Sequence, residues 1–176
     1  QNPLADPYIL GVSSGAGAGV VVASVLIPAV SLAFLPLWAF LGAIFTVFTV
    51  FGFVRLGRSS SITNYILVGV MVNAFFSAVM MLFLFFSGAK IQGIMVWLMG
   101  DFGSTQNPVL LMACFLVVPI TFVLCVLGYQ ISILSLGDDQ AKSIGIKISK
   151  LRTLVFFLAS ILTGLAVALA GVIGFV

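Results

Sequence analysis

No charged side chain occurs in four long stretches of this 176-residue chain, which cover residues 7–54, 59–89, 102–137 and 153–176. A helix needs about 20 mostly apolar residues to cross a bilayer, and every stretch is longer than that. The apolar residues follow one another without the alternation of a barrel strand, so they predict helices. Only 6% of the residues are charged, against about 25% in soluble domains. We therefore expect an all-α integral membrane protein.

Turn signals divide these stretches into five expected crossings. Pro28, Ser31 and Pro36 break the first stretch, which is too long for a single crossing. The apolar core of residues 94–99 is too short to cross and contains Trp97, which favours a short interfacial helix. The expected crossings lie near residues 8–27, 37–54, 62–86, 108–127 and 153–174, in a single transmembrane domain over residues 1–176. The ends, QNPLADP and GVIGFV, lead us to expect a piece of a longer membrane protein.

The basic residues lie almost entirely on one side of this topology. Loops joining successive crossings alternate between the two sides of the membrane, and basic residues are enriched on the cytoplasmic side. Only Lys90 falls on one side. The other side holds Arg55, Arg58, Lys142, Lys147, Lys150 and Arg152. The bias predicts that loops 55–61 and 128–152 are cytoplasmic.

The polar composition argues against an enzyme. The chain has no histidine, no glutamate and no GxxxxGK[ST] phosphate-binding loop. Its four aspartates lie outside the expected crossings and form no metal-ligand set or nucleophile–base pair. We expect no catalytic residue, no metal site and no bound cofactor. Proton pumps and ion-coupled carriers usually need an ionisable group within the membrane, so that class is disfavoured as well.

Small residues recur at helical spacing in two expected crossings. Helices in lipid associate by close packing, and small side chains let their backbones approach. We therefore expect close helix contacts along two stripes. The first contains Gly11, Gly15, Gly19 and Ala23, and the second contains Ser160, Gly164 and Ala168.

Asn73 and Ser77 are neutral polar residues, four positions apart, inside the third expected crossing, and Gly69 continues their stripe. Two interpretations stay open on these residues alone. They could line a path for a large polar solute, or they could form hydrogen bonds between helices, worth about 0.6–2 kcal/mol each.

The segment LSLGDDQAKSIGIKI, residues 134–148, is a charged insert between apolar runs. Ser135 and Asp138 have capping-box spacing, and Gly145 is a suitable C-cap, so we expect a short helix over 136–144. A second helix is expected from Ile146 onward. Gly137, Ala141 and Ile144 would share one face of the short helix. That face could dock into a partner protein, or the helix could simply connect two crossings.

Four segments resemble motifs of the permease family of bacterial ABC importers for iron–siderophores, haem and vitamin B12. They are NPLADPYILGVSSGAGAG at 2–19, VWLMGDFG at 96–103, LSLGDDQAKSIGIKI at 134–148 and ALAGVIGFV at 168–176. They occur in the family's order and span nearly the whole chain. The one departure is Ile144, where leucine is commoner in the family.

The resemblance implies a fragment covering about the third to seventh crossings of a ten-helix permease in the bacterial cytoplasmic (inner) membrane. Such a permease pairs with a second permease subunit, here expected to be an identical copy, and with two ATP-binding cassette subunits. These ATPases bind ATP and Mg²⁺, and a soluble binding protein delivers the substrate. The cytoplasmic insert would be the coupling helix that seats in the ATPase, with Gly137, Asp138, Asp139, Ala141 and Gly145 as its central residues.

By the same resemblance, the third expected crossing lines the translocation path through Asn73 and Ser77. The cytoplasmic gate maps to Asn2, Leu4, Ile62 and Thr63. The carried chelate is an iron–siderophore, haem or cobalamin-type molecule. The alternatives are a subunit of a secondary transporter or channel without an ATPase, and a membrane scaffold that transports nothing.

Overall fold

A computed structural model describes residues 10–27, 34–57, 62–88, 91–100 and 107–172. The described part is helical and contains no strand, which confirms the all-α prediction. Its helices are α1 (Val12–Leu26), α2 (Leu35–Leu56), α3 (Ile62–Phe86), α4 (Ile91–Leu98), α5 (Asn107–Val126), α6 (Gly128–Ser135), α7 (Asp138–Ser143) and α8 (Ile148–Ala170).

Each of the five expected crossings coincides with a helix. The helices α2, α3 and α8 are long and apolar enough to cross a membrane. Helix α5 has 20 residues, and its part from Ala113 to Val126 forms a possible broken span together with α6, from which it is bent by 53°. Helix α1 has 15 residues in the described part, and its predicted range begins earlier, outside the described residues. Five crossings therefore stay a prediction.

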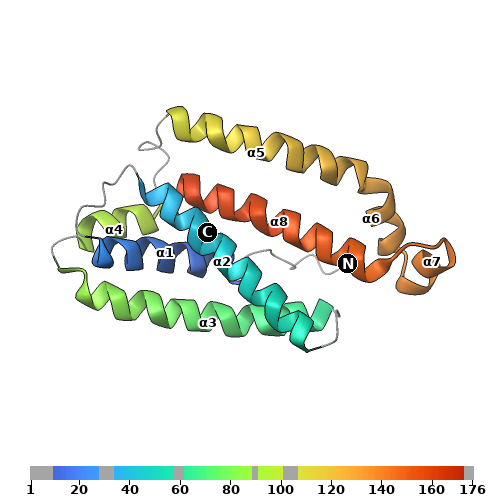
Figure 1. The fold of residues 1–176 in the computed structure, drawn as a ribbon, viewed down its shortest axis with the longest axis horizontal. Coiled ribbons are helices and arrows are strands. Elements are labelled where there is room, and N and C mark those ends of the chain that lie inside the picture. The colour runs from blue at the N-terminus through green and yellow to red at the C-terminus, as the bar shows by residue number, and fades with distance from the viewer. Residues whose placement is uncertain (1–9, 28–33, 58–61, 89–90, 101–106, 173–176) are drawn as a thin grey trace.

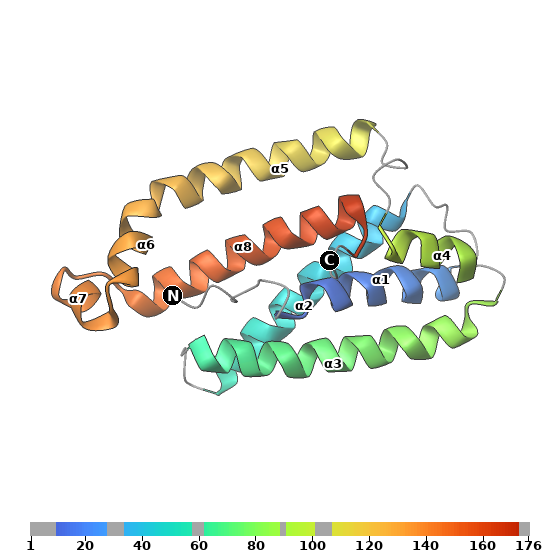
Figure 2. The same ribbon diagram turned by 180° about the vertical axis from the view of Figure 1, so that it is seen from behind.

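The helices form a bundle with one loosely attached arm (Figure 1). Helices α1, α2, α3 and α8 pack on one another, and α4 lies beside α1. Helix α5 runs alongside α8 at the edge of the bundle, and both views show α6 and α7 together beyond the first turn of α8 (Figures 1 and 2). Trp97 of α4 is buried in the main core, so it serves helix packing here.

The first small-residue stripe brings the backbones of two helices into direct contact. Gly15 and Gly19 of α1 face Gly42 of α2, and a Cβ atom built on Gly19 would lie 2.5 Å from the carbonyl oxygen of Trp38. A Cβ on Gly42 would overlap the carbonyl oxygen of Gly15. The two backbones thus touch directly, as the stripe predicted, and Gly42 is the partner that the sequence pattern did not identify.

The second stripe packs on the same helix. Ser160, Gly164 and Ala168 of α8 are all buried, and a Cβ on Gly164 would lie 3.0 Å from the Cβ of Ala43 in α2. Helix α2 therefore lies between α1 and α8. The hydroxyl of Ser160 donates to the carbonyl of Phe156 at 2.7 Å, so its buried oxygen is satisfied within its own helix.

A third backbone contact joins two segments that are far apart in the sequence. Gly100, just after α4, and Gly171, just after α8, both have positive φ, at 86° and 80°. A Cβ on Gly171 would lie 2.8 Å from the Cα of Gly100. This contact fixes α4 against the end of α8.

Substituting each of the two glycines of α2 by alanine should separate the effect of close backbone contact on stability from the effect of helix propensity. Gly42→Ala should lower the free energy of unfolding by about 1–3 kcal/mol, because its methyl group would force two backbones apart. Gly52→Ala is the matched control, since a Cβ there meets nothing within 4 Å and alanine gains up to about 1 kcal/mol of helix propensity. Thermal unfolding in detergent measures both. Equal stability of the two variants would contradict the packing described here.

Candidate functional site

The predicted cytoplasmic loop folds into a compact helical hairpin between α5 and α8. Leu127 links α5 to α6 by two helical hydrogen bonds: the Leu127 amide donates to the Val123 carbonyl at 3.0 Å, and the Ile131 amide donates to the Leu127 carbonyl at 2.9 Å. Sequence reasoning missed α6 because its residues continue the apolar run of α5. Gly128, at the bend, is the signal that was available.

The turn into α7 depends on Gly137. Its φ of 127° and ψ of 155° form a conformation that side chains with a Cβ rarely adopt. Helix α7 therefore begins at Asp138, two residues later than predicted. The predicted capping box does not form, because the Ser135 hydroxyl donates to the Ser132 carbonyl at 2.7 Å and no side chain caps α7.

The end of α7 is a Schellman motif, in agreement with the prediction of Gly145 as its C-cap glycine. The Ile146 amide donates to Ala141 at 3.1 Å, and the Gly145 amide donates to Lys142 at 2.9 Å. Gly145 has a φ of 83°, which glycine adopts without strain. Helix α8 then starts at Ile148, two residues later than the second helix was expected to begin.

A small apolar core holds α7 against its two neighbours. Ala141 is completely buried between Ile133 of α6 and Ile148 of α8, and Leu134 and Ile146 pack around them. This corrects the expectation that Ala141 shares one docking face with Gly137 and Ile144. The chain folds back at Gly137, so α7 turns its alanine inward. Ala141 fixes the position of α7 from inside.

Two large apolar side chains remain on the outside of this hairpin. Leu136 is 67% exposed and Ile144 is 61% exposed. They flank α7 at the turns before and after it. The backbones of Asp138 and Asp139 form the first turn of α7, while their side chains lie outside the described part.

The second set of predicted site residues lies on α3. Tyr65, Gly69, Val72 and Phe76 are buried. Asn73 and Ser77 are half-buried at the edge of this face, next to a broad exposed surface that includes Met71, Phe75 and Met81. Within the described residues, neither polar side chain makes a hydrogen bond to another helix. The described residues thus offer no partner for the interhelical hydrogen bonds that one of the two interpretations requires.

The predicted gate is only partly visible. Asn2 and Leu4 lie outside the described residues, as does the side chain of Ile62. Ile62 is the first residue of α3, and Thr63 is exposed beside it. The α6–α7 hairpin and the start of α3 both lie toward the same end of the bundle (Figure 1).

An aromatic cluster connects the start of α3 to α8, and sequence reasoning missed it. Tyr65 is 2% exposed, and its hydroxyl lies 3.0 Å from the hydroxyl of Thr153 in α8. Its ring stacks on Phe156 at 5.4 Å and meets the edge of Phe51 in α2 at 5.2 Å. These contacts join α3, which contains the candidate path residues Asn73 and Ser77, to α8, which follows α7.

Residues 1–176 match the model of the FecCD transport family. The chain belongs to this family. It is thus a multi-pass protein of the cytoplasmic membrane, in agreement with its apolar helices.

Curated relatives are named as permeases of ABC transporters or of import and transport systems. The uncharacterised ABC transporter permease YvrB of Bacillus subtilis is 36% identical over 181 residues, covering 100% of this chain and 51% of the relative. The vitamin B12 import permease BtuC of Serratia proteamaculans is 36% identical, with 100% and 52% covered. The hemin transport permease HmuU of Yersinia pestis is 33% identical, with 100% and 54% covered. The chain thus spans about half the length of these relatives.

A solved structure has the same arrangement of helices. It is a transporter assigned to the metal-chelate ABC type, in an inward-facing conformation. The TM-score is 0.87 at 32% sequence identity, covering 98% of this chain and 55% of the other. The similarity extends over the bundle, the bent arm and the hairpin together.

Changing the glycine at the end of α7 should loosen the hairpin. Gly145→Ala forces a left-handed backbone on a residue with a Cβ, at about 1–2 kcal/mol, so amides of residues 138–148 should exchange with deuterium about tenfold faster. Hydrogen-exchange mass spectrometry measures the rate. Gly128→Ala is the control, because Gly128 has equal space around it but a helical backbone. Unchanged exchange in Gly145→Ala would contradict the role of this turn.

Proposed function

We propose that this chain is the permease part of an ATP-driven importer for an iron–siderophore, haem or cobalamin-type chelate. The observation that carries the proposal is the family match over residues 1–176, supported by relatives named for vitamin B12 and hemin transport. In the proposed assembly two copies of the permease pair with two ATPase subunits, and a soluble binding protein supplies the substrate. ATP and Mg²⁺ are bound by the ATPases, and this chain binds no cofactor of its own.

The α6–α7 hairpin is proposed as the contact with the ATPase. A loop on the cytoplasmic side is surrounded by water, and exposed apolar side chains there favour a protein partner. Leu136 and Ile144 supply such side chains, with Gln140 and Lys142 exposed between them. Gly137, Asp138, Asp139 and Gly145 shape the turns and the first turn of α7, and Ala141 fixes it from inside.

The proposed mechanism is alternating access driven from outside the membrane. When ATP draws the two ATPases together, α7 is displaced with them. The core around Ala141 transmits that displacement to α8, because α7 cannot shift without disturbing Ile148. The Tyr65–Thr153 hydrogen bond and the aromatic cluster connect α8 to the start of α3. Thr63 and Ile62 at that start, with Asn2 and Leu4, are the proposed cytoplasmic gate.

The translocation path is proposed to follow the edge of α3 that contains Asn73 and Ser77. A neutral lining suits a large polar chelate, because it offers hydrogen bonds and does not hold a chelate of opposite charge by ion pairing. The surrounding exposed apolar surface of α3 leaves room for the second permease copy. A path between two subunits needs no ionisable group within these helices.

The assembly can be tested by native mass spectrometry on the protein purified gently from its source membrane. Two permeases with two P-loop ATPases are expected. Ile144→Asp should abolish retention of the ATPase while the permease pair survives, because it places a charge in the apolar contact. Ser132→Asp is the control, since it adds the same charge at an exposed position of α6. A permease that never retains an ATPase would indicate a secondary transporter or channel instead.

Replacing Asn73 should show whether its side chain lines the translocation path or forms a hydrogen bond to another helix. Asn73→Leu keeps the approximate size and removes the polar group. If the residue lines the path, uptake of radiolabelled chelate into proteoliposomes should fall severalfold with the thermal midpoint unchanged. If it bonds another helix, the thermal midpoint should fall instead. Val70→Leu, at an exposed position of the same helix, is the control and should change neither.

A further inference from the structure

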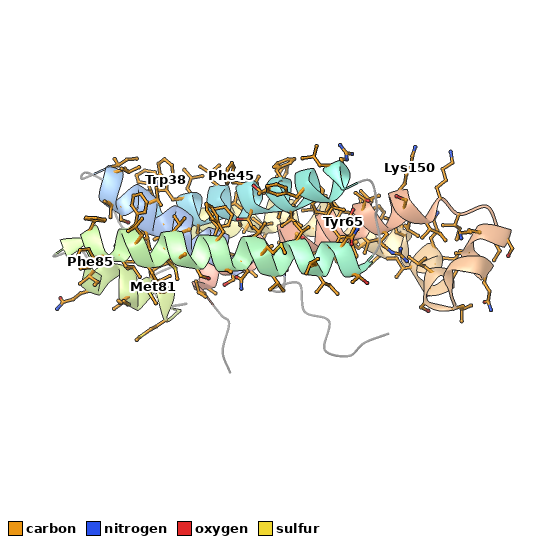
Figure 3. All side chains as sticks on the ribbon, turned by 90° about the horizontal axis from the view of Figure 1, so that it is seen from below. Trp38, Phe45, Tyr65, Met81, Phe85 and Lys150 are labelled. Atoms are coloured by element: carbon orange, nitrogen blue, oxygen red, sulfur yellow. The ribbon has the colours of Figure 1, made fainter. Side chains whose placement is uncertain are left out.

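A cavity of about 630 Å³ opens between α2 and α8 at the predicted cytoplasmic end of the bundle. Tyr65 of α3 closes its inner wall, and Phe51 lies beside it. Figure 3 shows Tyr65 and Lys150 toward the same end of the bundle, opposite Trp38 and Phe85. The cavity is separate from the α6–α7 hairpin and from the Asn73 edge of α3.

The mouth of this cavity is basic. Arg55 lies in the last turn of α2, and Lys150 lies in the first turn of α8. Both side chains are exposed, and neither forms an ion pair with a described residue. None of the described lining residues is acidic. The mouth therefore favours a negatively charged group.

The interior of the same cavity is apolar and open along α2. Gly52 lies there, and a Cβ on it would meet nothing within 4 Å. The other helix glycines of α1 and α2 lie against neighbouring atoms, so within these two helices Gly52 is the one that no packing contact explains. One turn further from the mouth, Phe48 and Phe157 meet edge to face at 5.8 Å, and Phe48 is 60% exposed.

These features follow one another along the helix axis. Gly52 is about 4–5 Å and Phe48 about 10 Å from Arg55, at 1.5 Å of rise per residue. The positive charges lie at the expected level of the membrane surface, and the apolar groove lies directly below them. This arrangement matches a molecule that has an anionic head and a hydrocarbon tail. Basic pockets between transmembrane helices on the cytoplasmic side are suited to anionic lipid head groups.

We propose that this cavity is a binding site for an anionic phospholipid of the cytoplasmic leaflet. The phosphate lies between Arg55 and Lys150, with the Ser149 and Thr153 hydroxyls within the same lining. One acyl chain lies over Gly52 and against Phe48 and Phe157. The proposed head-group cations, Arg55 and Lys150, belong neither to the hairpin nor to the path, although the inner wall of the cavity includes Tyr65 and Thr153 of the proposed connection between α8 and α3.

The test uses the protein purified from its source membrane and placed in micelles with equal amounts of phosphatidylglycerol and phosphatidylcholine. Native mass spectrometry should find phosphatidylglycerol retained in preference to phosphatidylcholine. The double variant Arg55→Gln/Lys150→Gln should weaken that retention about tenfold or more. Lys147→Gln is the matched control: it removes one nearby charge outside the cavity lining and should retain the lipid.

A second variant tests the groove without changing any charge. Gly52→Leu fills open space on α2, so the protein should fold and lose the lipid although both cations remain. Equal retention of the two lipids by the unchanged protein would overturn the proposal. Full retention of phosphatidylglycerol by Gly52→Leu would also overturn it. The same holds if a thiol placed at the mouth by Arg55→Cys is protected from a thiol reagent in lipid-free micelles, because another part of the chain would then cover the cavity. Binding of the ATPase is not expected to change in any of these variants.

Discussion

Direct contact between helix backbones is the constraint on which the rest of this structure depends. In lipid, apolar side chains gain little by leaving one apolar surface for another, so helices associate through close packing. Gly42 of α2 lies against Gly15 and Gly19 of α1, and Ala43 on the same helix lies against Gly164 of α8. Helix α2 is thereby fixed between two partners. The aromatic cluster at Tyr65 and the cavity beside it take their shape from that placement.

The sequence was sufficient to predict the elements that depend on composition and local chemistry. Charge-free runs predicted the long helices, and small-residue stripes predicted which faces approach closely. The glycine at position 145 predicted the end of α7, because its turn needs a positive φ. The order of four motifs indicated the family, which the match over residues 1–176 confirms.

What the sequence did not reveal depends on contacts between distant segments. The expected crossing ended at residue 127, but the 53° bend there and the helix α6 beyond it were not predicted, because residues 128–135 continue the charge-free run. The burial of Ala141 follows from the chain folding back onto Ile133 and Ile148, which helix periodicity cannot foresee. Trp38 and Thr46 stand four positions before and after Gly42, so no stripe of small residues marked it. The hydrogen bond between Tyr65 and Thr153 joins residues 88 positions apart.

The contact between Gly100 and Gly171 has a mechanical consequence. Helix α8 has 23 residues and is therefore about 34 Å long. Its first turn is seated on α7 at one end of the bundle, and its far end touches the backbone after α4 at the other end. A rigid rod of this length that tilts by about 5° moves one end by about 3 Å relative to the other. With no side chain at the glycine contact to absorb the movement, α8 would act, in the mechanism proposed above, as a lever that carries a displacement of α7 to α4.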